Sequence, residues 1–449
     1  MEPAAPVPAE ADRLPPRPLY HHLALTVYWL SNSLLWGGLL HLGFQSRLSD
    51  WFDEVSVGYY MGVLGAVGGL LATAAQIIVG AFSDRSLHPW GRRRPYLVAG
   101  SLLGLGSLML LGATKSFWPF AGAFLLLQVC MNAALGPFTA LLPDTINPRE
   151  HGKAAGFMGV ARLVGDVGGL ILAARLLSAG RLHGQPPWVI REFHDQRFWL
   201  MCVLMAGFTL LTMLYTILAI REEPLRQRPA QTTWQTVIGS FVVDVRGNPD
   251  FFWLSLSRAI TNLGFYMFLQ ILYFFLRYSL KTPDAENASM LVMLPAIGTA
   301  ILASLPAGMI SDRLGQRRPL VFVAQFVMAA AALIFVFAPN MTWAYIAGVP
   351  AGLAYGIFTA VEWALACNLL PQGESARYLG VWNASAVVPQ VLAFPLGGAI
   401  GSRLSAYIPG LGWRVVFALT VVCCVVGALF LKHVHERRDT PASCGVDGP

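Results

Sequence analysis

Charged residues are scarce in this sequence, and that scarcity excludes most soluble folds. Only 12% of the 449 residues are Asp, Glu, Lys or Arg, whereas soluble domains average about 25%. Hydrophobic residues make up 55% of the chain, and the mean hydropathy is +0.57. So few charges could not cover a water-facing surface, because the apolar residues would then be exposed to water. The sequence therefore predicts an integral membrane protein.

The chain also lacks the patterns that mark enzymes and metal proteins. Its six cysteines have neither metal-site nor disulfide spacing, and five of them lie inside apolar stretches. It has no phosphate-binding loop and no nucleophile–base motif. Its N-terminus has no basic start, and the first apolar stretch is too long for a signal peptide. We therefore expect no enzyme activity, no cofactor and no bound metal.

Apolar stretches recur along the chain at the length that crosses a bilayer, roughly 20 residues. About twelve are present, at 23–44, 57–82, 96–113, 117–142, 154–178, 198–220, 251–280, 288–310, 320–338, 343–369, 378–400 and 415–432. We predict an all-α membrane protein with two six-helix bundles, 21–220 and 250–433. A cytoplasmic linker at 221–249 separates them and carries an amphipathic helix over 232–245. The tails, 1–20 and 434–449, are expected to be cytoplasmic, the first of them disordered.

Basic residues gather in alternate loops. The net charge of +7 would suit nucleic-acid binding in a soluble protein. Here the Lys and Arg residues lie in short loops between apolar segments, which is the positive-inside pattern. That pattern predicts a multi-pass protein of the cell membrane with both termini cytoplasmic. Its partners are then the lipid bilayer and a small solute, not nucleic acid.

A loop motif occurs twice, after the second helix of each predicted bundle. The first copy reads SDR at 83–85 and GRRRP at 91–95, and the second reads SDR at 311–313 and QRRP at 316–319. An Asp at a helix end can pair with Arg residues of the following loop, and Pro suits the first turn of a helix. The candidate gate residues are Asp84, Arg85, Arg92, Arg93, Arg94, Asp312, Arg313, Arg317 and Arg318.

The duplicated loop resembles that of the major facilitator superfamily. The longer first copy, with GPFTALLPD at 136–144 two helices later, is similar to sucrose transporters and to the glycoside–pentoside–hexuronide cation symporters. The resemblance implies sugar uptake driven by a proton or sodium gradient, with two bundles that open alternately to each side. It also implies that the first, fourth, seventh and tenth helices line the substrate path. We expect a monomer.

Charged residues inside a membrane are functional candidates by default. Arg162 and Asp166 lie four residues apart in the fifth apolar stretch and share a helix face. One interpretation is a self-neutralising pair without a transport role. The other is that Arg162 binds sugar hydroxyls and Asp166 positions it or takes part in proton coupling. Melibiose-type symporters place a sugar-binding arginine near this point of the same helix, although the flanking residues differ.

Glu362 is the second candidate for proton coupling. It has no basic residue within one turn, and a lone carboxylate in an apolar environment tends to take up a proton. The alternatives are a neutral hydrogen-bonded carboxyl or an ion pair with Arg258. Arg258 in turn either extends to the membrane surface or pairs with Glu362 or Asp244. The neighbouring Trp363 is a packing residue or, if it faces the cavity, a platform for a sugar ring.

Neutral polar side chains trace single faces of several helices. Amides and phenols beside aromatic rings suit an uncharged polyol, although one such stripe could equally join helices. The predicted substrate-binding stripes comprise Tyr28, Asn32, Trp36, Gln128, Asn132, Asn262, Tyr266, Gln270, Tyr273, Asn383 and Gln390.

The choice of coupling ion depends on where the chain departs from its relatives. Melibiose-type symporters hold sodium with aspartates in the second and fourth helices, and 57–82 and 117–142 contain no acidic residue. We therefore predict a proton-coupled sugar symporter, for a disaccharide or glucoside. Two alternatives stay open: an exporter of amphipathic compounds on the same fold, and a membrane sensor that binds without transporting.

Overall fold

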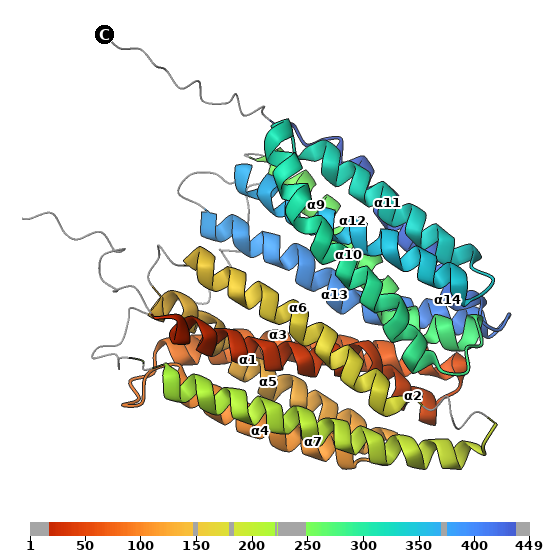
Figure 1. Cartoon of the computed structure of the whole chain (residues 1–449), viewed down its shortest axis with the longest axis horizontal. Coiled ribbons are helices and arrows are strands. Elements are labelled where there is room, and N and C mark those ends of the chain that lie inside the picture. Colours follow the sequence, from red (N-terminus) through yellow and green to blue (C-terminus); the bar gives the residue numbers. More distant parts are fainter. Residues whose placement is uncertain are drawn as a thin grey trace, which may run out of the picture. The chain divides into compact units, whose positions relative to one another are not determined.

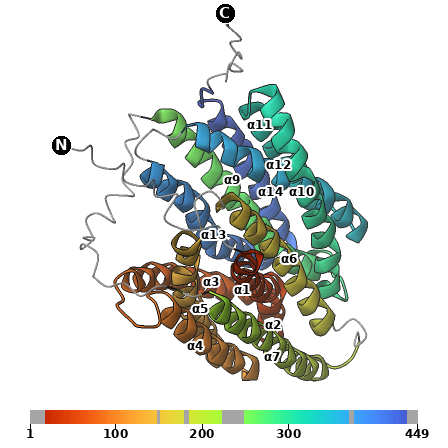
Figure 2. The same cartoon turned by 60° about the vertical axis from the view of Figure 1, so that its left-hand side comes forward.

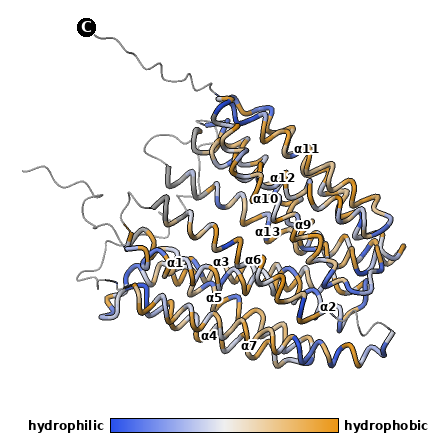
Figure 3. The backbone as a smooth tube through the Cα atoms, viewed as in Figure 1, coloured by the Kyte–Doolittle hydropathy of each residue, from blue (hydrophilic) through white to orange (hydrophobic). Residues whose placement is uncertain are grey.

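The computed structural model describes residues 18–146, 151–178, 184–220, 222, 248–369 and 375–436. Within these ranges the secondary structure is helical, without a strand. Among the residues described, twelve helices are long and apolar enough to cross a membrane, as the sequence predicts. Hydrophobic residues run along the helices, and hydrophilic stretches gather near their ends (Figure 3). The chain divides into two compact units, which are described separately.

The first unit contains the first six spans (Figure 1). Its first span is α1 (Leu19–Gly38), continued by the π-helical turn η2 (Leu39–Gly43) and by α2 (Phe44–Trp51). The other spans are α3 (Glu54–Asp84), α4 (Arg94–Ala113), α5 (Phe117–Thr145), α6 (His151–Leu177) and α7 (Pro187–Ala219). Residues 52–63, at the start of α3, are assigned to the second unit.

The second unit contains the other six spans (Figure 2). Its first span is α9 (Pro249–Phe274), and this span also ends in a π-helical turn, η5 (Phe275–Ser279). The other spans are α10 (Ala285–Leu314), α11 (Arg318–Phe337), α12 (Met341–Asn368), α13 (Ser375–Ser405) and α14 (Leu411–Leu431). Within this unit α10 packs on α12, and α14 packs on α9 and α11.

Two helices extend well beyond their predicted ends. The first span continues to Trp51, and α7 begins at Pro187, eleven residues before the expected start at 198. Both extensions carry charged residues, which the apolar pattern excludes. Arg47 is fully buried, and its guanidinium lies 2.9 Å from Asp50 and 2.5 Å from Asp195. These extensions are stable as helices because their charges neutralise one another inside the unit.

Glycines allow helices to approach one another closely. In the first unit, a Cβ on Gly169 of α6 would collide with the carbonyl oxygen of Leu34 in α1. In the second unit, a Cβ on Gly356 of α12 would collide with the Ala300 carbonyl of α10. These two contacts bring the first helix of one unit against its fifth, and the second helix of the other unit against its fourth.

Some predicted segments fall outside the described residues. These are the predicted amphipathic helix at 232–245, almost all of the linker and most of both tails. The predicted domain boundaries therefore stay a prediction.

Candidate functional site

Three helices of the second unit converge on a buried charge pair. Arg258 of α9 donates a hydrogen bond of 2.7 Å to Oε2 of Glu362 in α12. The guanidinium carbon lies 4.0 Å from the ring centroid of Trp382 in α13, which is a cation–π contact. Glu362 is fully buried, while 18% of the Arg258 side chain is exposed. The prediction that Arg258 extends to the membrane surface is therefore wrong, and the alternative prediction, an ion pair with Glu362, is confirmed.

The pair leaves hydrogen-bonding capacity unused. Oε1 of Glu362, Nε of Arg258 and Nε1 of Trp382 are all buried, and none has a hydrogen-bond partner among the described residues. Buried polar atoms in native proteins are usually paired, so three such atoms in one cluster mark a place where a proton, a water or a solute hydroxyl could be held.

An aromatic surface adjoins the pair. The ring of Trp363, next to Glu362 on α12, lies 6.0 Å from that of Trp382, and 48% of Trp363 is exposed. Behind the pair, Phe251 and Leu254 of α9 belong to a buried apolar cluster with Trp382. Trp382, which packs on Arg258, therefore belongs to the apolar cluster and also lies close to the exposed indole of Trp363.

Arg162 and Asp166 lie on α6 of the first unit. Arg162 is exposed and Asp166 is half-buried. Among the described residues they form no direct ion pair, although Arg162 attracts the Asp166 carboxylate electrostatically. The backbone of Asp166 lies against Gly37 of α1. An exposed Arg162 can contact a solute, as the substrate-binding interpretation requires, and that role stays a prediction.

The predicted polar stripe of the first unit is mostly buried. The Tyr28 hydroxyl lies 2.8 Å from the Ser101 hydroxyl of α4, and its ring packs on Phe138. Asn132 donates to the Gln128 carbonyl oxygen at 2.9 Å within α5. Further along α1, Asn32 is buried with Oδ1 unpartnered among the described residues, and Trp36 is half-buried.

The stripe of the second unit is divided between core and surface. Asn262 and Gln270 are buried on α9, with Tyr266 half-buried between them. Tyr273 donates to Glu286 of α10 at 2.9 Å and accepts a hydrogen bond from Arg277. Asn383 and Gln390 are exposed on α13. Substrate contact by these residues stays a prediction.

The first copy of the loop motif forms an ion pair, as expected for its residue types. Arg93 pairs with Asp84 at the end of α3, and it also donates to the Ser83 hydroxyl at 2.7 Å. Arg94 donates to the Ile217 carbonyl of α7 at 2.5 Å. In the second copy, Arg318 donates to the Lys432 carbonyl beyond α14 at 2.9 Å. The side chain of Asp312 lies outside the described part of the chain.

A glutamate caps the motif helix in each unit. Glu222 accepts hydrogen bonds from the Arg93 amide at 2.8 and 3.1 Å and from the Arg94 amide at 3.3 Å. Glu436 accepts from the Arg317 amide at 2.8 Å and from the Arg318 amide at 2.9 Å. Each carboxylate thus neutralises the positive end of α4 or α11.

Sequence reasoning missed both capping residues. Glu222 lies three residues after α7 ends at Ala219, and Glu436 lies five residues after α14 ends at Leu431. The available signal was a glutamate shortly after the last helix of each half. The loops alone could not reveal it, because the contacts join residues 129 and 119 positions apart.

Comparisons with known proteins identify the family. Residues 59–431 match the family described as MFS/sugar transport protein. The chain is 30% identical over 141 residues to sucrose transport protein SUC4 of Arabidopsis thaliana, covering 27% of this chain and 28% of that protein. It is 27% identical over 177 residues to the general alpha-glucoside permease of Schizosaccharomyces pombe, covering 36% of this chain and 31% of the permease. The chain thus matches less than a third of either relative's length.

Solved structures share the fold at low identity. A D-xylose-proton symporter superposes with a TM-score of 0.70 at 14% identity, covering 94% of this chain and 98% of that one. The nucleoside transporter NupG gives 0.66 at 14% identity, covering 93% and 99%. An inward-facing bacterial homologue of the human lysosomal transporter Spinster gives 0.65 at 16%, covering 92% and 95%. The chain therefore belongs to the MFS/sugar transport protein family, and it is a multi-pass membrane protein with the major facilitator fold.

Proposed function

We propose that this transporter is a proton-coupled sugar symporter that works by alternating access and takes a disaccharide or glucoside. The observation that carries the proposal is the Arg258–Glu362 pair, a buried carboxylate with one oxygen on arginine and the other unpartnered among the described residues. The names of the matched relatives, a sucrose transporter and an α-glucoside permease, support the substrate class.

The coupling step is a competition for the Glu362 carboxylate. Arg258 and a proton both bind this group, and arginine itself stays charged at any physiological pH. When Glu362 takes up a proton, its charge attraction to Arg258 is lost, and the guanidinium donors become available to a sugar hydroxyl. When the sugar leaves, Arg258 returns to the carboxylate and displaces the proton. A solute and a proton are thereby bound and released together.

Each unit, taken by itself, offers exposed side chains of a kind that binds sugars. Arg162 is exposed and offers several N–H donors in a planar fork, which suits adjacent sugar hydroxyls. Trp363 is also exposed and offers a flat apolar surface to the C–H face of a sugar ring. Asn383 and Gln390, exposed on α13, add neutral donors and acceptors.

The loop motifs and their caps act as the gate. Asp84 with Arg93, and the capping residues Glu222 and Glu436, fix the ends of α3, α4 and α11. We place this gate and both termini on the cytoplasmic side of the cell membrane, because the basic loops follow the positive-inside pattern. We also propose that the monomer is the transporting unit.

Transport into proteoliposomes tests the function. Purified protein is reconstituted, and uptake of labelled sucrose, maltose and glucose is measured with and without an inward proton gradient. We expect at least one disaccharide to accumulate only when the gradient is imposed. Accumulation that ignores the proton gradient contradicts the coupling. Uptake of amphipathic dyes without any sugar uptake favours an exporter.

Glu362→Gln isolates the coupling residue. We expect gradient-driven accumulation to be lost while sugar exchange between equal concentrations persists, because the amide cannot take up a proton. Glu192→Gln is the matched control, since Glu192 is exposed on α7. Gradient-driven accumulation by Glu362→Gln at the control level would rule out Glu362 as the proton site.

Arg162→Lys tests the substrate contact. We expect the KM for sugar to rise about tenfold or more, because lysine cannot reproduce the planar fork. Arg175→Lys is the control, since Arg175 is also exposed on α6. An equal KM for sugar in both variants would show that Arg162 does not contact the substrate.

A further inference from the structure

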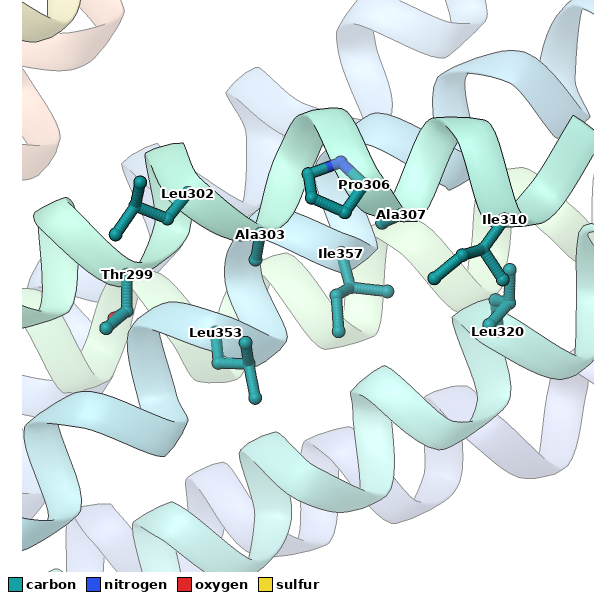
Figure 4. Close-up of a pocket in the computed structure, with 9 residues that line it drawn as sticks. All are labelled: Thr299, Leu302, Ala303, Pro306, Ala307, Ile310, Leu320, Leu353 and Ile357. Carbon is teal, nitrogen blue, oxygen red and sulfur yellow. The ribbon is translucent and has the colours of Figure 1, made fainter.

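An apolar groove runs along α10 of the second unit (Figure 4). It has a volume of about 340 Å³, and its walls come from α10, α11 and α12. The side chains that line it are aliphatic except for Thr299: Leu302, Ala303, Pro306, Ala307, Ile310, Leu320, Leu353 and Ile357. The Thr299 hydroxyl is already engaged with carbonyl oxygens of α10 and α12. The groove therefore offers almost no hydrogen-bonding capacity to an occupant.

The shape of the groove follows from the residues of α10. Ala303 and Ala307 are small and buried, so they form a floor, while Leu302 and Ile310 are exposed and form a rim. Leu320, near the start of α11, lies at the same end of the groove as Ile310 (Figure 4). The result is a hollow open toward the surface of a membrane-spanning unit, where the solvent is hydrocarbon.

The length of the groove matches one leaflet of a bilayer. From Thr299 to Ile310 the helix rises about 16 Å at 1.5 Å per residue. The hydrocarbon core of a bilayer is about 30 Å thick, so one leaflet supplies about 15 Å of acyl chain. A single acyl chain lying along the groove would therefore be buried over most of its length.

A positive charge lies at one end of the groove. Leu302, Pro306, Ile310 and Arg313 recur at spacings of four, four and three, so Arg313 continues the stripe of lining residues by one turn. Arg313 is exposed. On the opposite wall, α11 begins at Arg318, two residues before Leu320. The apolar groove therefore ends near the exposed Arg313 and the start of α11.

We propose that this groove is a binding site for an anionic phospholipid, with one acyl chain between α10 and α11 and the phosphate at Arg313. A basic residue at the membrane surface attracts an anionic lipid by about 1 kcal/mol, and an acyl chain in the groove adds van der Waals contacts with the aliphatic side chains that line it. The inference does not depend on which solute is transported.

A second groove in the same unit provides a matched control. It has about 410 Å³ and is lined by Ala330, Leu333, Ile334, Phe337, Pro339 and Trp343. Arg414 donates to the carbonyl oxygens of Val336 and Ala338, on either side of the lining residue Phe337, at 2.7 and 2.8 Å. This groove is also lined by apolar side chains, and the guanidinium of Arg414 beside Phe337 is already bound to the backbone. We expect it to accept acyl chains without preference for the headgroup.

Native mass spectrometry of the delipidated full chain tests the proposal. The protein is titrated with phosphatidylglycerol, with phosphatidylcholine of the same chains, and with glycerophosphoglycerol, which has no chains. We expect one phosphatidylglycerol to bind more tightly than phosphatidylcholine, and the chainless compound not to bind. Arg313→Gln should weaken phosphatidylglycerol binding about fivefold and leave phosphatidylcholine unchanged. Equal binding of the two lipids to the wild type would overturn the proposal.

A large side chain in the groove tests the acyl-chain contact separately from the phosphate contact at Arg313. Ala303→Phe should abolish the tight phosphatidylglycerol site, and Ala330→Phe in the control groove should not. Because Ala303→Phe could fail to fold, the wild type is also cross-linked with phosphatidylglycerol that carries a photoreactive tail. We expect labelled peptides from 299–310 and 353–357. Labelling spread evenly over all lipid-facing helices would refute the site without any variant.

Discussion

The cap on α11 offers a direct test of how the loop motif is held. Both oxygens of Glu436 accept hydrogen bonds from the amides of Arg317 and Arg318, at 2.8 to 2.9 Å. The next residue, Pro319, has no amide hydrogen. No side chain of the helix itself caps this N-terminus. Glu436→Gln keeps the shape of the side chain but removes its charge and one of its two acceptors.

The size of the effect follows from these contacts. A hydrogen bond to a charged group contributes about 1.5 to 3 kcal/mol. The loss of a negative charge at a helix N-terminus adds about 0.3 to 1 kcal/mol, partly offset by the oxygen that glutamine retains. We expect the local opening free energy to fall by about 1.5 to 3 kcal/mol. Amide exchange should then accelerate about tenfold to 150-fold.

Hydrogen–deuterium exchange with mass spectrometry measures this change directly. A peptide that covers 315–321 reports the Arg317 and Arg318 amides, and faster exchange should be confined to this start of α11. Glu222→Gln makes the same change in the first unit and should accelerate exchange over 91–97. Glu192→Gln, which removes an exposed charge on α7, should change neither peptide.

Two results would refute the reasoning. Unchanged exchange in 315–321 would mean that the carboxylate does not hold these amides in solution. Acceleration over the whole second unit would mean that Glu436 supports global folding and not one helix end. Because Glu222 and Glu436 make matching contacts, a large effect in one unit and none in the other would also contradict the duplication of the cap.

Two further predictions concern helix packing and helix initiation. Gly169→Val should lower the melting temperature of the purified protein, measured by tryptophan fluorescence, because its Cβ would collide with the Leu34 carbonyl; Gly168→Val should be mild, because the nearest atom to a Cβ there is 3.7 Å away. A similar loss in both would contradict the contact. Asp53→Ala should destabilise the start of α3 by about 1 kcal/mol, because Asp53 accepts from the hydroxyl and amide of Ser56 at 2.5 and 2.9 Å. These bonds hold the pKa of Asp53 below its usual range, so its contribution is present at neutral pH and is lost as pH falls through that lowered pKa. The melting temperatures of wild type and variant should therefore converge as the pH is lowered stepwise from 7, and a difference that stays constant down to the acid unfolding of the wild type would contradict this.

The fold could be predicted from the sequence because two strong signals agree. Each apolar stretch is long enough to cross a bilayer, and the duplicated loop places six such stretches on either side of residue 221. The ends of the helices could not be predicted in the same way. The extension of α7 to Pro187 depends on Asp195, which pairs with Arg47 from another span. Sequence periodicity contains no information about such a partner.

The candidate site could likewise be predicted only in part. The buried charges Glu362 and Arg258 stand out in any apolar stretch, so the sequence identified both. Their hydrogen bond joins residues 104 positions apart, and the sequence left it as one alternative among several. Trp382 was missed because one tryptophan in an apolar helix has no distinguishing pattern. Its role against the Arg258 guanidinium depends on the packing of α13 on α9.

The capping glutamates also set an order in which each unit can be completed during synthesis. The amides at the start of α4 leave the ribosome well before Glu222, which follows the last helix of the first unit. Until that residue emerges, the amides at the start of α4 lack the carboxylate that caps them, and the same holds for α11 until Glu436 is made. The capping contact of each unit is therefore formed only after all of the unit's described helices have been translated. A nascent chain stopped just before position 222 would contain all six helices of the first unit and still lack the contact that closes it.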